Sequence, residues 1–155
     1  MSARILIVDD HEVLREGLKS LLAKLRPEWT ICGEATDGKE AIQAAQELKP
    51  DLMTLDITMP NLSGLEAAAE MRRLGMRFPI LIFTTHQSER LAADVQQAGA
   101  QGYVLKSQAA RNLVLAIDAL VADGTFWGSS PENSPAKEQK QNPRISFRRT
   151  LVFAT

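Results

Sequence analysis

Polar residues stand where four short apolar runs of this sequence end. The runs are residues 4–8, 52–55, 80–83 and 103–105, and they are followed by Asp9 with Asp10, Asp56, Thr84 and Lys106. Carboxylates that converge from several strand ends repel one another and resist joint ionisation unless a cation neutralises them. A hard divalent ion such as Mg²⁺ meets that need with oxygen ligands. Three carboxylates, a hydroxyl and an amine therefore indicate a site for a metal ion and a phosphoryl group.

Residue types alone leave two duties open for Asp56. It can be a metal ligand only, or a ligand that also attacks phosphorus and forms an aspartyl phosphate. Lys106 favours the second duty, because an ammonium group can neutralise phosphoryl oxygens while the Thr84 hydroxyl donates a hydrogen bond to another. Taken singly, Lys106 is typical of a solvated lysine and Thr84 of a strand end. Their occurrence at successive strand ends favours one common site.

Strand-like and helical patterns alternate along the first four fifths of the chain, which indicates repeated βαβ units and a parallel sheet. Residues 30–35 form the remaining predicted strand, residues 36–38 supply turn and capping chemistry, and a loop over 59–64 precedes a helix from Leu65. Five βα units favour an open sheet, because a closed eight-fold barrel needs about 250 residues. The predicted fold class is α/β, a doubly wound five-stranded parallel sheet with helices on both faces. Its ligands bind beyond the carboxyl ends of the strands, where the polar residues lie.

Composition allows one compact domain and gives no general charge-driven function. The chain has 155 residues, is 45% hydrophobic and carries a formal net charge of -1, so nothing draws it generally toward nucleic acid or anionic membranes. The single cysteine, Cys32, excludes an intrachain disulfide. No run approaches the roughly 20 apolar residues that span a bilayer, and no leader pattern begins the chain. We expect a cytoplasmic protein with no membrane partner.

Three segments resemble the receiver domain of bacterial two-component response regulators: ILIVDDH at 5–11, LDITMPNLSGLE at 55–66 and GYVLKS at 102–107. The stretch VDDHEVLREGL at 8–18 and the phrase TTH at 84–86 are more specifically similar to the NarL/FixJ subfamily. The resemblance covers about Arg4 to Asp123. It implies a flavodoxin-like (βα)5 fold with strand order 2-1-3-4-5, and a receiver domain over residues 1–126.

The resemblance also implies a role for each site residue. Asp56 accepts a phosphoryl group from a sensor histidine kinase or a small phosphodonor, and Lys106 and Thr84 contact the phosphoryl oxygens. Mg²⁺, or Mn²⁺, is held by Asp10, Asp56 and the backbone carbonyl of Thr58, with Asp9 acting mainly through bound water. Such a domain catalyses only its own phosphorylation and dephosphorylation.

Signalling is implied to be a shift between two packings. New charge at Asp56 draws Thr84 inward and frees space for Tyr103, the position of the family's switch aromatic. The readout is the surface of the fourth helix, fifth strand and fifth helix, a possible homodimer contact. Thr58 and His86 hold the positions that tune the lifetime of the acyl phosphate. Ser107 stands where many receivers have proline, so the geometry of the preceding peptide bond stays open.

Residues 127–155 are predicted to form a linker-like tail with no effector domain. Polar residues and prolines dominate from Gly128, and only twelve mixed basic and apolar residues follow from Arg144. A helix-turn-helix module does not fit there, so nucleic-acid binding is not expected. The tail could instead add a strand to a neighbouring sheet, be exchanged between subunits, or have no evolved role.

Two other classes of protein share features with the receiver. A haloacid-dehalogenase-like phosphohydrolase also uses an aspartyl-phosphate intermediate, but its nucleophile lies in an Asp-x-Asp motif after the first strand. A flavodoxin-like cofactor binder would place a phosphate loop where this chain has Asp9 and Asp10. The two histidines, His11 and His86, lack ligand spacing, so we expect them in exposed loops rather than as a general base, a phosphodonor or a metal ligand.

Overall fold

The computed structural model describes residues 2–128. The predictions made for residues 129–155, including every role considered for the tail, lie outside these described residues. Within residues 2–128, no helix combines the length and the apolar character that crossing a membrane requires.

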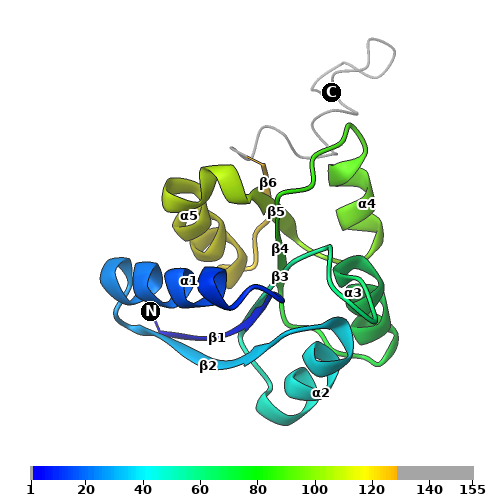
Figure 1. The fold of residues 1–155 in the computed structure, drawn as a ribbon, viewed down its shortest axis with the longest axis horizontal. Coiled ribbons are helices and arrows are strands. Elements are labelled where there is room, and N and C mark those ends of the chain that lie inside the picture. The colour runs from blue at the N-terminus through cyan, green and yellow to red at the C-terminus, as the bar shows by residue number, and fades with distance from the viewer. Residues whose placement is uncertain (1, 129–155) are drawn as a thin grey trace, which may run out of the picture.

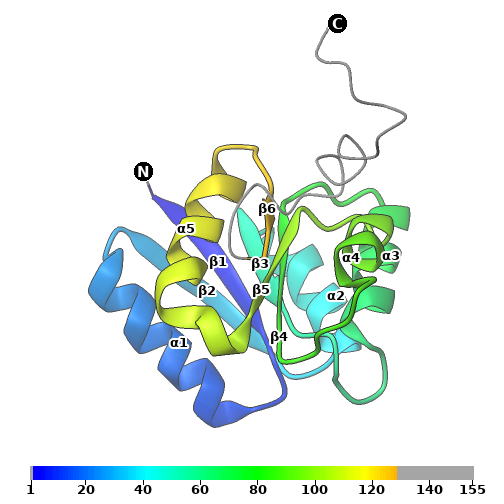
Figure 2. The same ribbon diagram turned by 90° about the horizontal axis from the view of Figure 1, so that it is seen from above.

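Six parallel strands form one sheet, in the order β2-β1-β3-β4-β5-β6 (Figures 1 and 2). The elements follow one another as β1 (Ala3–Val8), α1 (Glu12–Leu25), β2 (Trp29–Ala35), α2 (Gly38–Leu48), β3 (Leu52–Leu55), α3 (Gly64–Arg73), β4 (Ile80–Thr84), α4 (Leu91–Gln97), β5 (Gly102–Leu105), a 3-10 turn (Lys106–Gln108), α5 (Ala109–Val121) and β6 (Phe126–Trp127). The predicted α/β class and the order of the first five strands are confirmed.

Helices cover both faces of the sheet, as predicted. Figure 1 shows α1 and α5 on one face and α2, α3 and α4 on the other. Two apolar clusters fill the two layers, and the central strands contribute to both by alternating their side chains. Ile5, Leu6 and Ile7 are all fully buried because β1 is covered on both sides. This burial explains why the central strands appear in the sequence as continuous apolar runs.

The sixth strand is an addition to the predicted fold. It pairs with β5 through only two residues, with Gly102 opposite Phe126 and Tyr103 opposite Trp127. Phe126 enters the core beneath α1 and α5, and Trp127 enters the core on the other face. Gly102 permits this approach, since an added Cβ would lie 2.1 Å from the main-chain oxygen of Phe126. The two residues of β6 lie on either side of the boundary expected after residue 126, and the division into domains stays a prediction.

The loop after β3 is closed by the start of α3, one residue earlier than predicted. Ser63 and Glu66 form a capping box, in which each side chain accepts a hydrogen bond from the other residue's main-chain N–H. Gly64 donates its N–H to the main-chain oxygen of Ile57 at 2.8 Å. A Cβ at Gly64 would lie 1.9 Å from the main-chain oxygen of Asp56. The absence of a side chain thus lets α3 begin directly against the end of β3.

Candidate phosphoryl-acceptor site

The carboxyl ends of β1, β3 and β5 bring a lysine between two buried carboxylates. Lys106 Nζ lies 2.7 Å from Asp9 Oδ2 and 3.1 Å from Asp56 Oδ2. The three side chains are only 11%, 2% and 5% exposed, respectively. Lys106 also lies over the Phe83 ring, with Nζ 5.9 Å from the ring centroid. The sequence pattern predicts that these strand ends share one edge, and the structure places Asp9, Asp56 and Lys106 in contact.

Asp56 lies in surroundings that disfavour its charge. Burial raises the pKa of the Asp56 carboxyl, the nearby Asp9 carboxylate adds to the rise, and Lys106 opposes both. The second oxygen, Oδ1, accepts a hydrogen bond from the main-chain N–H of Ile57 at 2.8 Å. Asp56 is therefore a carboxyl group whose ionised form depends on nearby positive charge.

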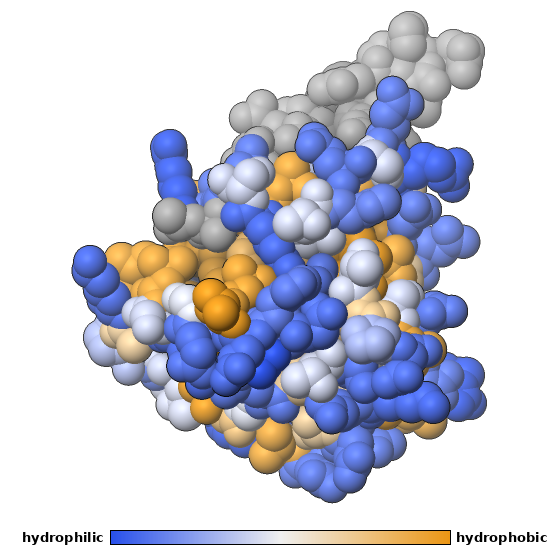
Figure 3. All heavy atoms as spheres, in the orientation of Figure 1, coloured by the Kyte–Doolittle hydropathy of each residue, from blue (hydrophilic) through white to orange (hydrophobic). Residues whose placement is uncertain are grey.

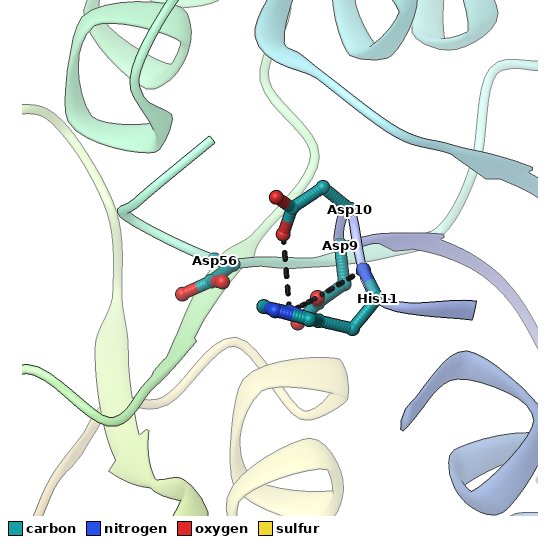
Figure 4. A group of neighbouring side chains, drawn as sticks. All are labelled: Asp9, Asp10, His11 and Asp56. Atoms are coloured by element: carbon teal, nitrogen blue, oxygen red, sulfur yellow. Dashed lines mark hydrogen bonds and ion pairs between the residues drawn. The ribbon is translucent and has the colours of Figure 1, made fainter. Parts of the chain in front are cut away.

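His11 joins the acidic residues, a contact that the sequence pattern does not predict. Its Nδ1 lies 3.1 Å from Asp9 Oδ1 and 3.1 Å from Asp10 Oδ1, and its main-chain N–H donates to Asp9 Oδ1 at 2.9 Å (Figure 4). Potential ligand atoms of Asp9, Asp10, His11 and Asp56 all lie within 4.8 Å of one another. The histidine is exposed, as expected. Its place directly after Asp10, before α1 begins, is the signal that could have identified it.

The donor set fits a hard divalent cation. Asp9 Oδ2 is a buried oxygen without a hydrogen-bond partner among the described residues, although the Lys106 ammonium is close. Asp10 presents a partly exposed carboxylate beside it. Carboxylate oxygens that converge from two strand ends, with one side open to solvent, suit Mg²⁺, which retains several waters.

The remaining predicted site residues differ in burial and in their contacts. Thr84 is buried, and its hydroxyl oxygen accepts a hydrogen bond from the main-chain N–H of His86 at 3.0 Å. Tyr103 is half-buried and meets the Trp127 ring edge to face, with centroids 6.4 Å apart and an interplanar angle of 60°. Thr58 and His86 are exposed. Lys106 and Ser107 are joined by a trans peptide bond, since no described peptide bond is cis.

An apolar groove of about 620 Å³ opens beside the site. It runs along α1 and includes His11 and Lys106 of the charged cluster. Its lining is His11, Val13, Leu14, Gly17, Leu18, Leu21, Phe83 and Lys106. Val13 is 86% exposed at its edge. In Figure 3, hydrophobic surface gathers on the side of the molecule where α1 and α5 lie.

A family model described as the response regulator receiver domain matches residues 5–118. The transcriptional regulatory protein YdfI of Bacillus subtilis (strain 168) is 42% identical over 118 residues, which cover 76% of this chain and 54% of YdfI. The nitrate/nitrite response regulator protein NarL of Escherichia coli (strain K12) is 36% identical over 120 residues, covering 77% of this chain and 55% of NarL. The chain thus spans about half the length of these curated relatives.

A solved structure shares both the fold and the sequence pattern. The two-component response regulator of the LuxR family from Aurantimonas sp. SI85-9A1 is 36% identical, with a TM-score of 0.79, over 94% of this chain and all of that one. None of these likenesses supports the phosphohydrolase considered from the sequence. The chain belongs to the response regulator receiver domain family, the phosphoryl-accepting signalling domains of two-component systems.

Proposed function

We propose that Asp56 is the phosphoryl acceptor of this receiver and that a sensor histidine kinase is its donor. The contact between Lys106 and the two buried carboxylates carries this assignment. Asp9 and Asp56 are both buried and in contact with the ammonium group, and Asp56 is the one that directly follows β3, one of the two central strands of the sheet. Asp9 is held by His11, and Asp10 is more exposed.

The transfer needs the ionised carboxylate of Asp56. One of its oxygens attacks the phosphorus of a phosphohistidine, a P–O bond forms as the P–N bond breaks, and the imidazole nitrogen keeps the bonding electrons and takes up a proton. Lys106 then lies beside the new phosphoryl oxygens and neutralises part of their charge. The oxygen of the Thr84 hydroxyl already accepts a hydrogen bond from the main chain, and the hydroxyl donates a hydrogen bond to one of the phosphoryl oxygens.

Asp10, Asp56 and the backbone carbonyl of Thr58 would hold Mg²⁺ or Mn²⁺, with Asp9 contributing directly or through water. When bound, the ion would supply positive charge that offsets the repulsion among these carboxylates and the phosphoryl oxygens. The residues themselves keep the ligands in place, because Asp9 is buried and fixed by the main-chain N–H of His11.

Thr84 and Tyr103 would form the switch, through a population shift that follows phosphorylation. Movement of Thr84 toward Asp56 breaks its hydrogen bond with the N–H of His86 and opens space on the side of Tyr103. The surface formed by α4, β5 and α5 changes in consequence. Thr58 and His86, both exposed, would control how readily water reaches the acyl phosphate.

The apolar groove along α1 would meet the kinase. A protein donor must bring its phosphohistidine to Asp56, and a surface that approaches this edge of the sheet meets Val13 and Leu14 beside the charged cluster. A homodimer through α4, β5 and α5, and a cytoplasmic location, stay predictions from the sequence.

Acetyl phosphate labelling tests the acceptor. Wild-type chain with Mg²⁺ should gain one phosphoryl group by intact mass, and Asp56→Asn should gain none because the amide is not a nucleophile. Asp118→Asn, which alters an exposed carboxylate on α5, should label as the wild type does. Normal labelling of Asp56→Asn would overturn the assignment, and repeated turnover of a phosphomonoester would favour the phosphohydrolase.

A further inference from the structure

Arg15 reaches back from the first turn of α1 to the loop that carries the acidic residues. Its Nη1 donates a hydrogen bond to the main-chain oxygen of Asp9 at 2.7 Å, and its Nε donates to Glu34 Oε1 at 2.8 Å. The side chain is only 13% exposed. One guanidinium group therefore joins α1, β2 and the loop after β1.

Asp9 is held by hydrogen bonds through its main chain as well as its side chain. Its main-chain N–H donates to the oxygen of Ala35 at 3.0 Å, and its side-chain Oδ1 accepts from the N–H of His11. With Arg15 on the carbonyl, the main chain of Asp9 is held from two neighbouring elements. Asp9 Oδ2, a buried oxygen that lies 2.7 Å from Lys106 Nζ, is thereby kept in the site.

Glu34 near the end of β2 anchors the guanidinium. Its Oε1 accepts from Arg15 and its Oε2 from Lys19 at 2.8 Å, and these two cations hold the pKa of Glu34 below its usual value. Lys19 pairs with Glu16 as well as with Glu34. Two cations thus share one carboxylate, and Arg15 is the one that also bonds to the acidic loop.

We propose that Arg15 is a positioning residue for metal binding, which acts through the main chain of Asp9 and is itself oriented by Glu34. This inference rests on the proposed function, because it takes Asp9 and Asp10 to be ligands of the ion. A planar guanidinium can serve two acceptors in fixed directions, whereas an ammonium group cannot reproduce that geometry. Partners that orient metal ligands typically contribute about 10- to 100-fold to metal affinity.

Direct Mn²⁺ binding by the full chain, measured by electron paramagnetic resonance, tests the proposal. Arg15→Met should weaken binding about tenfold. Lys19→Met, which removes the other cation on Glu34, should change the Mn²⁺ affinity less than about twofold.

Arg15→Lys should recover part of the loss seen in Arg15→Met, since a lysine can still donate to the Asp9 carbonyl. Glu34→Gln should weaken binding less than Arg15→Met, and the double variant should be no weaker than Arg15→Met alone.

Thermal unfolding of each variant in EDTA separates positioning from folding. A merely structural role would lower the unfolding midpoint and leave the Mn²⁺ affinity of the folded chain unchanged, which would overturn the proposal. Equal losses of affinity in Arg15→Met and Lys19→Met would overturn it as well, because they would indicate general charge. If the wild type itself bound no Mn²⁺, the proposed metal site would fail first, and the role of Arg15 with it.

Discussion

Asp56 is a carboxyl group whose environment opposes the charge its chemistry requires. Burial and the neighbouring Asp9 carboxylate raise its pKa. Lys106 opposes this rise, but the same ammonium group also contacts Asp9. The folded protein therefore contains an electrostatic penalty at neutral pH that added positive charge, from a metal ion, would relieve. The same residues that suit phosphoryl transfer thus make the unliganded site locally unfavourable.

Replacing Asp56 by Asn should stabilise the metal-free protein at neutral pH. The folded-state pKa of Asp56 is raised, so the stability associated with its protonated form is present below the unfolded-state pKa and is lost as pH rises through the folded-state pKa. Asp56→Asn removes this loss. In EDTA, its unfolding midpoint should exceed the wild-type value at about pH 8, and the difference should shrink toward about pH 4.

The exposed Asp118→Asn variant serves as the control and should follow the wild type across this range, because surface pairs contribute little. A lower midpoint for Asp56→Asn than for wild type at neutral pH would contradict the prediction, because it would mean that the pair with Lys106 outweighs the cost of burial.

At the scale of elements, β6 connects the switch position to the end of the described chain. Phe126 donates its N–H to the main-chain oxygen of Gln101 at 3.2 Å, and Gly128 donates to that of Tyr103 at 3.1 Å. Trp127 packs its buried ring against Tyr103. A strand of two residues depends on such side-chain packing, because two residue pairs supply few hydrogen bonds.

Trp127 should therefore report the state of Tyr103. In a Trp29→Phe chain, beryllofluoride with Mg²⁺ should change the emission of Trp127, because inward movement of Tyr103 removes the edge contact at 6.4 Å. Trp29 lies beside Arg26 at the other end of the sheet, so a Trp127→Phe chain is the matched control and should show no change. An unchanged response after Tyr103→Ala would show that the signal does not come from this pair.

The sequence predicted the elements that burial dictates. Strands covered on both faces, such as β1 and β4, are continuous apolar runs, and Asp37, within the predicted capping segment 36–38, caps α2. The sequence places Ser63 in a loop, and the structure shows it as the cap of α3. A strand as short as β6 has no period to detect, so the pattern predicts only a domain boundary at Phe126 and Trp127. At the site, strand ends predicted which residues meet. The contacts of Arg15 depend on side-chain direction, which spacing does not encode.

For the whole molecule, the site connects the two halves of the sheet. Asp9 follows β1, Asp56 follows β3 and Lys106 follows β5, so the contacts of this one cluster span most of the sheet's width. A single domain of this size typically unfolds as one unit. Relief of repulsion at the cluster should consequently appear as stability of the entire fold.

Mg²⁺ should raise the unfolding midpoint of the whole domain. A ligand that binds only the folded state adds about 2.7 kcal/mol at 100 times its dissociation constant. Asp10→Asn should lose most of this gain, because Asp10 is a candidate ligand of the ion. Its carboxylate lies beside the exposed His11. Asp118→Asn should keep it, and NaCl of equal ionic strength should give less. An equal rise in the wild type and in Asp10→Asn would place the ion elsewhere, since screening alone does not distinguish the two chains.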